Sequence, residues 1–229
     1  MSGNSTSFEW HRHSRLWWVL PAASVVLAAG APLAADIIDR IAVSVGNRVI
    51  TTSDLDREIR VTAFLNGSKP DLSPANKRAT AQRMVEQTLI RRELEVSRYP
   101  VPTAAEVEPV LETFRRQNFK SDAEFRKALA DAGITEQDVK DELLWQRALL
   151  LFIDVRFRPG VQISEQEIQN YFNNVVALTA QPGQRLSLED YRASIVEKLA
   201  GQRVDQELDT WLKEARRRTE IVFHEEAFQ

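Results

Sequence analysis

The chain has 229 residues and a formal net charge of −3 at pH 7, with 43% hydrophobic and 28% charged residues. This composition is typical of a globular protein rather than a disordered or fibrous chain. Cysteine is absent, which excludes disulfides, thiolate catalysis and zinc sites built on sulfur. Three histidines leave little material for a histidine-based metal cluster, and the slight acidity argues against nucleic acid as a partner, because phosphate binding needs a basic surface.

Residues 1–35 have the pattern of an export signal. A basic start that includes Arg12 and Arg15 precedes an uncharged stretch over 16–35, which ends in small residues. We expect cleavage after Ala35. The alternative is an uncleaved anchor, because about 20 apolar residues can span a bilayer. In both cases we expect residues 36–229 outside the cytoplasm, in the periplasm, with the membrane contacted only through an uncleaved signal segment.

Strand signals stand at the two ends of this exported part. Residues 41–45 and 48–51 are rich in β-branched side chains and flank Gly46 and Asn47, which tolerate positive φ, so they predict a β-hairpin. Residues 220–223 predict a short strand. A hairpin alone is marginal, and we expect this strand to complete a small sheet with it.

The rest of the chain has helical periodicity and repeated capping signals. A hydroxyl residue followed three positions later by a carboxylate marks a helix start, because the two side chains satisfy free backbone N–H groups. Such boxes occur at Thr103/Glu106, Ser121/Glu124 and Ser164/Glu167, with Asp variants at Ser53/Asp56, Thr135/Asp138 and Ser187/Asp190. The pattern predicts helices over 54–65, 74–97, 104–118, 122–132, 136–158, 165–175 and 188–217.

Two of these helices carry further information. The helix over 136–158 is apolar on nearly every face of its later turns, so we expect it to be central and buried on most sides. In the helix over 188–217 the apolar stripe changes phase beside Gly201, which predicts a kink or a change of packing partner there.

No residue pattern carries catalysis. His224 adjoins Glu225 and Glu226, which could suggest a metal or acid–base pair, but the alternative is a solvated chain terminus. Carboxylates at 54, 56 and 58 stand at a helix start, where stabilisation of the helix dipole is the favoured reading over a catalytic dyad. Phosphate-binding, zinc-protease and serine-hydrolase motifs are absent from the sequence. We therefore expect no catalytic residue, no metal, no cofactor and no nucleotide.

Large apolar side chains at two places are candidates for binding a partner. Phe114, Phe119 and Phe125 fall near the junction of two short helices, and Leu65 and Leu72 flank a loop. Ordinary core packing is the alternative for each, since most large apolar residues are buried. Exposed apolar patches would mark a partner site.

Several segments resemble the SurA family of periplasmic chaperones. Residues 41–56 resemble the opening of that family, in which a hairpin leads into Ser-Asp-Leu at a helix start. The likeness continues over 89–94, 125–134, 143–147 and 163–168, and the closing helix and strand resemble 211–216 and Ile221. The resemblance implies a mainly α fold with a small antiparallel sheet, a helical domain like the peptide-binding domains of SurA and trigger factor.

The resemblance also implies a function. In SurA-like proteins the helix that 163–174 resembles leads into one or more parvulin isomerase domains of about a hundred residues, and a connection as short as 175–186 cannot hold a domain with its own core. We therefore expect residues 36–229 to form one chaperone domain that binds unfolded outer-membrane or secreted chains without ATP. The alternatives are a structural or assembly subunit that pairs with itself or with a separate parvulin-type folding factor, and a divergent prolyl isomerase.

Overall fold

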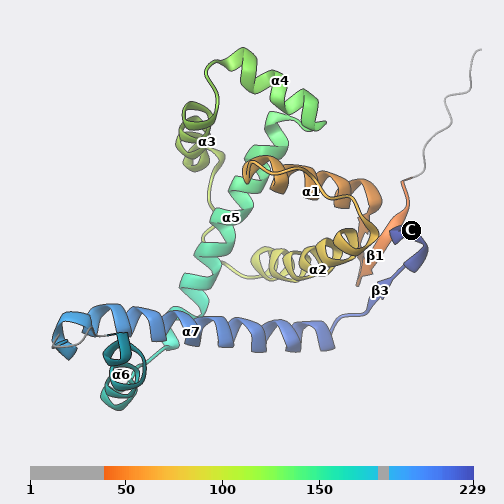
Figure 1. The fold of residues 1–229 in the computed structure, drawn as a ribbon. Coiled ribbons are helices and arrows are strands. Elements are labelled where there is room, and N and C mark those ends of the chain that lie inside the picture. The colour runs from red at the N-terminus through yellow and green to blue at the C-terminus, as the bar shows by residue number, and fades with distance from the viewer. Residues whose placement is uncertain (1–38, 180–185) are drawn as a thin grey trace, which may run out of the picture. The chain divides into compact units, whose positions relative to one another are not determined.

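A three-stranded sheet joins segments from the two ends of the described chain. The computed structural model describes residues 39–179 and 186–229, so the predicted signal lies outside the described residues. Strands β1 (Ile41–Val45), β2 (Arg48–Thr51) and β3 (Ile221–Phe223) form an antiparallel sheet in the order β2-β1-β3 (Figure 1). Gly46 takes φ 60° in the hairpin turn, where glycine has no steric cost. The predicted hairpin and its third strand are confirmed.

The remaining elements are helices, so the predicted fold class, mainly α with a small antiparallel sheet, is confirmed. The α-helices are α1 (Thr52–Leu65), α2 (Pro74–Val96), α3 (Ala104–Asn118), α4 (Asp122–Ala132), α5 (Glu136–Arg156), α6 (Glu165–Tyr171) and α7 (Leu188–Arg217). Short turns of helix are η1 (Arg158–Gly160), η2 (Phe172–Val176), η3 (Ala177–Thr179) and η4 (Glu225–Phe228). None of the described helices is both long and apolar enough to cross a membrane.

Capping residues fix most helix starts, and one start differs from the prediction. The predicted box at Ser187/Asp190 does not form, because the Ser187 side chain makes no cap hydrogen bond at the start of α7. The boxes at Thr135/Asp138 and Ser164/Glu167 form as predicted. At α1 the cap is Thr51 rather than Ser53: the Asp54 backbone N–H donates to Thr51 Oγ1 over 3.2 Å, and the Thr51 N–H donates to Asp54 Oδ2 over 3.0 Å. Helix α1 therefore follows β2 directly, which fixes its entry angle from the sheet.

Four apolar clusters hold the described elements together. The first lies between the sheet and α2, the second joins α1, α3, α4 and α5, and the third joins α2, α5 and α7. The fourth lies between α6 and the first half of α7. Helix α5 contributes to both the second and the third cluster, so it is central as predicted. Its burial is less complete than expected, because Leu150 is 57% exposed and Val155 45% exposed.

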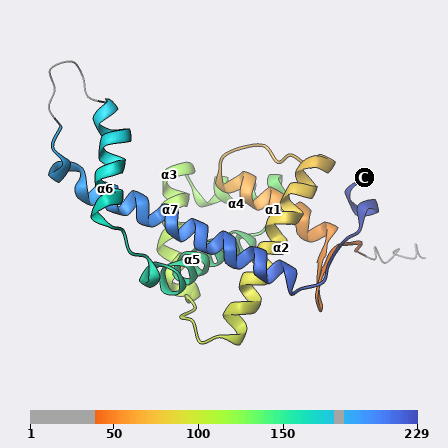
Figure 2. The ribbon, with the colours of Figure 1, turned by 90° about the horizontal axis from the view of Figure 1, so that it is seen from below.

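Helix α7 changes partners along its length without a break. Residues 188–199 pack on α6, whereas Leu208, Trp211 and Leu212 pack on α5 and α2 (Figure 2). The predicted change of partner near Gly201 is confirmed, and α7 is a single α-helix through that position. Arg216 Nη2 donates to Glu86 Oε1 over 2.8 Å and ties the end of α7 to α2. Arg216 therefore does more than cap its own helix.

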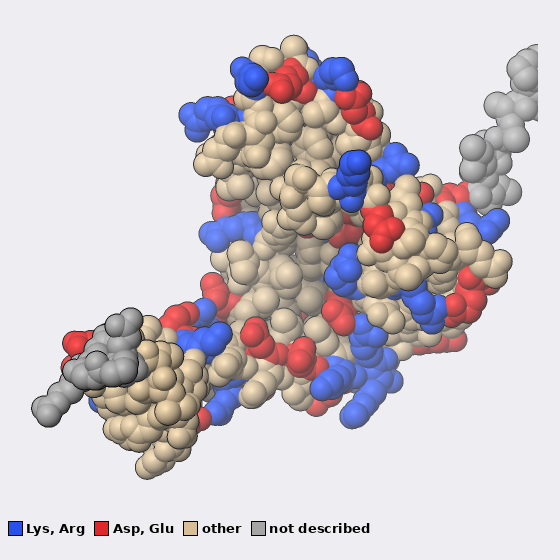
Figure 3. All heavy atoms as spheres, viewed as in Figure 1, with Lys and Arg blue, Asp and Glu red and all other residues tan. Residues whose placement is uncertain are grey.

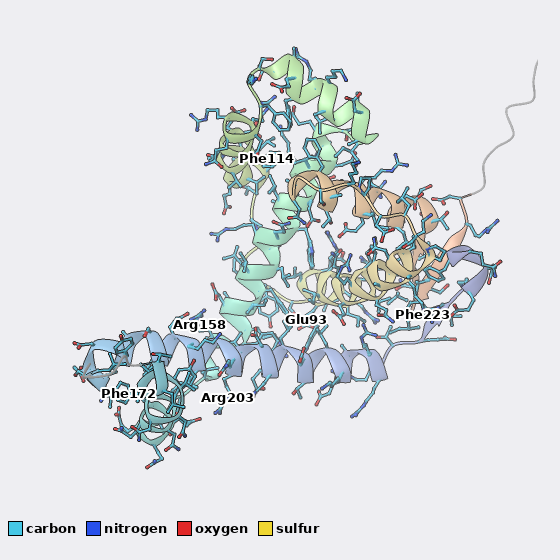
Figure 4. The ribbon with its side chains drawn as sticks, in the orientation of Figure 1. Glu93, Phe114, Arg158, Phe172, Arg203 and Phe223 are labelled. Atoms are coloured by element: carbon cyan, nitrogen blue, oxygen red, sulfur yellow. The ribbon has the colours of Figure 1, made fainter. Side chains whose placement is uncertain are left out.

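The segment that follows α6 differs from the predicted helix over 165–175. The α-helix ends at Tyr171, and Phe172–Val176 continue as a π-helical turn. Phe172 is buried between α6 and α7, near Ile168 and Ile195 (Figure 4). A π turn has i→i+5 hydrogen bonds and so accommodates one more residue than an α-helical turn. Phe172 stands at the start of this turn and stays in the cluster.

The segment after β3 is solvated only in part: Glu225 and Glu226 are exposed as predicted, but the residues after them are packed, which corrects the prediction of a solvated terminus. The His224 backbone N–H donates to the Ala42 carbonyl over 2.9 Å. Turn η4 then places Ala227 and Phe228, 6% and 5% exposed, in the cluster between the sheet and α2. The burial of the Phe228 side chain holds this segment against the sheet although an acidic pair precedes it. Ala227 and Phe228 therefore complete the core between the sheet and α2.

Candidate functional site

A hollow in the described part of the chain lies between α1, α2 and α5. Its volume is about 710 Å³, and we call it the client groove after the function proposed below. Figure 3 shows uncharged atoms on its floor beside α5 and charged side chains of both signs around it. Its lining residues are Asp54, Arg57, Glu58, Val61, Met84, Gln87, Thr88, Arg91, Leu94, Glu95, Val101, Asp138, Asp141, Glu142, Leu144, Trp145 and Ala148.

The apolar part of the groove comes from α2, α5 and the chain between α2 and α3. Trp145 is 4% exposed and packs with Leu94 in the third cluster. Leu144 is half-buried, and Val101 is 61% exposed at the groove edge. An aromatic and aliphatic floor with an open edge can take apolar side chains out of water, which favours binding by about 25 cal/mol per Å² of apolar area.

Arg91 lies over the aromatic floor. Its guanidinium carbon is 4.2 Å from the centroid of the Trp145 ring, a cation–π contact. Burial of this group in the groove lowers the pKa of Arg91, and the carboxylates of Glu142 and Glu58 oppose that shift. Arginine nevertheless stays charged at any physiological pH, so the floor carries a fixed positive charge.

Two carboxylates face this part of the groove from different helices. Glu142 on α5 accepts a hydrogen bond from Gln146 Nε2 over 2.8 Å, and Glu58 on α1 accepts one from Gln87 Nε2 over 3.2 Å. Burial raises the pKa of Glu142, and the negative charge of Glu58 raises it further. The groove therefore holds partly desolvated acids as well as an apolar floor.

Ion pairs define the rim. Arg57 pairs with Asp54 on its own helix, and its Nε lies 3.8 Å from Asp138 Oδ1 on α5. Glu95 pairs with Arg48 on β2. These exposed pairs add little stability individually, but they set which charges face the solvent side of the groove.

A second hollow adjoins the client groove across α5. It encloses about 410 Å³ between α3 and α5 and is lined in part by Ala104, Val107 and Lys140. Asp141 and Leu144 line both hollows, so one turn of α5 separates them.

The aromatic residues predicted to bind a partner lie in a different place. Phe114 and Phe119 are half-buried, Phe125 is fully buried, and all three pack with Phe64 and Leu65 in the second cluster. Figure 4 shows Phe114 on α3. The Phe119 and Phe125 ring centroids are 5.2 Å apart in an edge-to-face arrangement, and the Phe64 and Phe119 rings stack at 5.9 Å. The structure thus brings four of the predicted residues together outside the client groove: Leu65, Phe114, Phe119 and Phe125.

Leu72, the fifth predicted residue, is half-buried in the loop between α1 and α2 and is not part of that cluster.

The acidic residues at the start of α1 have three separate roles. Asp54 completes the α1 cap, Asp56 pairs with Lys77 Nζ over 2.8 Å, and Glu58 faces the groove. No group of three or more potential ligands is placed to hold a metal ion within residues 39–179 and 186–229.

Sequence reasoning missed Glu58, Arg91, Glu142 and Trp145 as groove residues. The spacing of Glu142 and Trp145 puts them on one face of α5, and this was the available local signal. Their partners stand on α1 and α2, and only the packing of the three helices shows that these side chains share a hollow.

Comparisons with known proteins find relatives of a single kind, named Chaperone SurA. No family model matches the chain. It is 25% identical to the Chaperone SurA of Pseudomonas fluorescens over 65% of its length, and 27% identical to that of Pseudomonas putida over 73%. It is 31% identical to the Chaperone SurA of Methylobacillus flagellatus over 58% of its length. The matched part is 35%, 39% and 31% of the three relatives, so the chain spans about a third of the curated relatives it matches. On this likeness, the chain is similar to chaperones of the SurA family.

Proposed function

We propose that this chain is an ATP-independent holdase that binds unfolded outer-membrane or secreted polypeptides in the periplasm, with the client groove as its binding site. The single observation that carries the proposal is an open hollow of about 710 Å³ with Trp145, Leu144 and Val101 among its lining residues. Such a surface is suited to apolar segments of unfolded chains, and the SurA-named relatives support a chaperone role. The proposal assigns the chain no catalytic step.

The binding should be weak and reversible. Apolar contact in the groove favours the complex, and the ordering of a disordered client offsets much of that gain. Weak binding with fast exchange suits a holdase, which must release its client to a folding pathway. Phe114 and Phe119, with Leu65 and Phe125 packed in the same cluster, are proposed as a second client contact, and Leu72 in the loop between α1 and α2 as a separate one.

An aggregation assay tests this function. An outer-membrane β-barrel protein is diluted from urea, and light scattering is followed with the full chain added in the absence of ATP. We expect several-fold molar excess to suppress scattering. Absence of suppression at that excess contradicts the proposal.

A matched pair of variants tests the site. Val101→Glu places a charge at the groove edge, while Val110→Glu places the same charge on α3 outside both hollows, at a side chain of similar exposure (61% and 51%). We expect V101E to lose suppression and V110E to retain it. Equal behaviour of the two variants would remove the groove from the proposal. A peptide turnover assay on a prolyl substrate checks the isomerase alternative, with background rate expected.

A further inference from the structure

Acidic side chains outnumber basic ones in the client groove. The lining includes two guanidinium groups, on Arg57 and Arg91, and six carboxylates, on Asp54, Glu58, Glu95, Asp138, Asp141 and Glu142. The chain as a whole has a net charge of only −3, so this excess is concentrated at the groove. A hollow lined by one dominant sign of charge with apolar walls focuses its field on whatever enters.

Among the described residues, the ion pairs at the rim include none of the inner carboxylates, Glu58, Asp141 and Glu142, within 4.0 Å. Arg57 is already shared between Asp54 and Asp138, and Arg48 is paired with Glu95. Glu58 and Glu142 accept hydrogen bonds from the neutral amides of Gln87 and Gln146.

Asp141 is held in the same way, since Gln137 Nε2 donates to its Oδ1 over 2.7 Å. In the described part of the chain, no ion pair within 4.0 Å joins Arg91 to a carboxylate of the groove. Arg91 instead lies on Trp145. The guanidinium of Arg91 is therefore the cation near three carboxylates whose side-chain hydrogen bonds come from neutral glutamine amides: Glu58, Asp141 and Glu142.

Building on the proposed function, we propose that the groove selects client segments in which a lysine or arginine lies next to an apolar side chain. The apolar side chain packs on the surface made by Leu144, Trp145 and Val101. The neighbouring cation approaches Glu58 and Glu142 from the open side. An acidic residue at the same place meets like charges and is disfavoured.

The chemistry of the groove favours a cationic client side chain over a neutral or an acidic one at the same place. A neutral segment gains the apolar contact but leaves the inner carboxylates unpaired. A cationic side chain keeps its flexible stem against the apolar floor while its charged end reaches the carboxylates. Exposed ion pairs contribute up to about 1 kcal/mol, which corresponds to about a fivefold change in affinity.

Three peptides test the preference by calorimetric titration into the full chain. Each is a capped ten-residue peptide of serine, glycine and threonine with a central Leu-X-Leu, where X is Lys, Gln or Glu. We expect the Lys peptide to bind about fivefold more tightly than the Gln peptide, and the Glu peptide to bind most weakly. The Lys advantage should shrink in high salt, because exposed charges are screened.

Variants assign the effect to the groove. The double variant Glu58→Gln, Glu142→Gln keeps side-chain size and should bring the Lys-to-Gln affinity ratio close to one. Glu207→Gln, an exposed carboxylate on α7 outside both hollows, should keep the wild-type ratio. Loss of the ratio in the double variant alone supports the inference.

The outcomes separate this inference from the proposed function. Equal affinity for the three peptides, together with suppressed client aggregation, overturns the charge preference and leaves the holdase function. The same holds if the aggregation assay is positive and no peptide binds. Failure of both the peptide and the aggregation experiments overturns the holdase function and the charge preference together.

Discussion

Arg91 on α2 covers the ring of Trp145 on α5, with its guanidinium carbon 4.2 Å from the ring centroid. This contact joins two walls of the client groove. Trp145 is only 4% exposed. The exposed face of the indole is therefore shared with a cation that belongs to the protein.

Loss of this contact should be measurable as stability. Arg91→Gln removes the cation–π contact and leaves the charges of Glu58 and Glu142 without their neighbouring cation. We expect the free energy of unfolding to fall by about 1 kcal/mol at neutral pH, measured by urea denaturation. Arg98→Gln, at an exposed position, should change it by less than about 0.5 kcal/mol. An R91Q variant as stable as the wild type would show that the burial cost of the guanidinium cancels the contact.

Glu142 gives the groove a pH dependence whose sign follows from its raised pKa. Burial, with the charge of Glu58, makes the folded protein hold this proton to higher pH than the unfolded chain does. The stabilising contribution is therefore fully present below the unfolded pKa, about 4.3, and is lost as pH rises through the folded pKa. We expect Glu142→Gln to gain stability relative to the wild type as the pH rises from about 4 through the raised pKa of Glu142 in the folded protein.

The measurement is a series of urea unfolding curves across that pH range. Glu207→Gln serves as the control, and its difference from the wild type should stay constant with pH. A constant difference for E142Q as well would mean that Glu142 titrates in the folded protein as it does in the unfolded chain.

The cap of α1 offers a comparison between two neighbouring hydroxyl residues. Thr51 accepts from the Asp54 N–H, whereas the Ser53 side chain caps nothing. We expect Thr51→Ala to cost about 1 kcal/mol of unfolding free energy and Ser53→Ala to cost less than about 0.5 kcal/mol. Thermal or urea unfolding of both variants decides the matter, and the reverse order would place the cap at Ser53.

Phe228 should behave as a core residue despite its position beside an acidic pair. It is 5% exposed, lies in the cluster between the sheet and α2, and has the guanidinium carbon of Arg78 5.7 Å from its ring centroid. We expect Phe228→Ala to lower the free energy of unfolding by about 3 kcal/mol. Gln229→Ala, one position further and exposed, should leave it within about 0.5 kcal/mol. A small effect of F228A would mean that η4 is a loosely held turn.

Local signals in the sequence were sufficient for most of the fold. Turn chemistry at Gly46 and Asn47 predicted the hairpin, and caps such as Thr135 and Ser164 predicted helix starts to within a residue. Such features depend on residues three or four positions apart, so the sequence contains them directly. The cap of α1 was misplaced by two residues because Thr51 and Ser53 both precede a carboxylate by three positions.

The candidate site could not be predicted in the same way. Glu58, Arg91 and Trp145 lie on three helices, and their proximity is a result of how those helices pack. The aromatic residues around Phe125 were visible from the sequence, and the structure shows them packed on one another rather than lining the groove. Apolar character alone does not distinguish a filled core from an open surface.

The pairing of β1 with β3 has a consequence for the order in which the protein folds. Ser44 Oγ and His224 Nε2 are 3.2 Å apart although 180 positions separate them in the chain. Until β3 pairs with it, β1 has an unpaired edge, and the apolar residues that Phe228 contacts in the folded protein stay exposed. Contacts this distant also slow folding, because the intervening loop must close first. A protein proposed to bind unfolded chains is therefore itself incompletely folded until β3 pairs with β1.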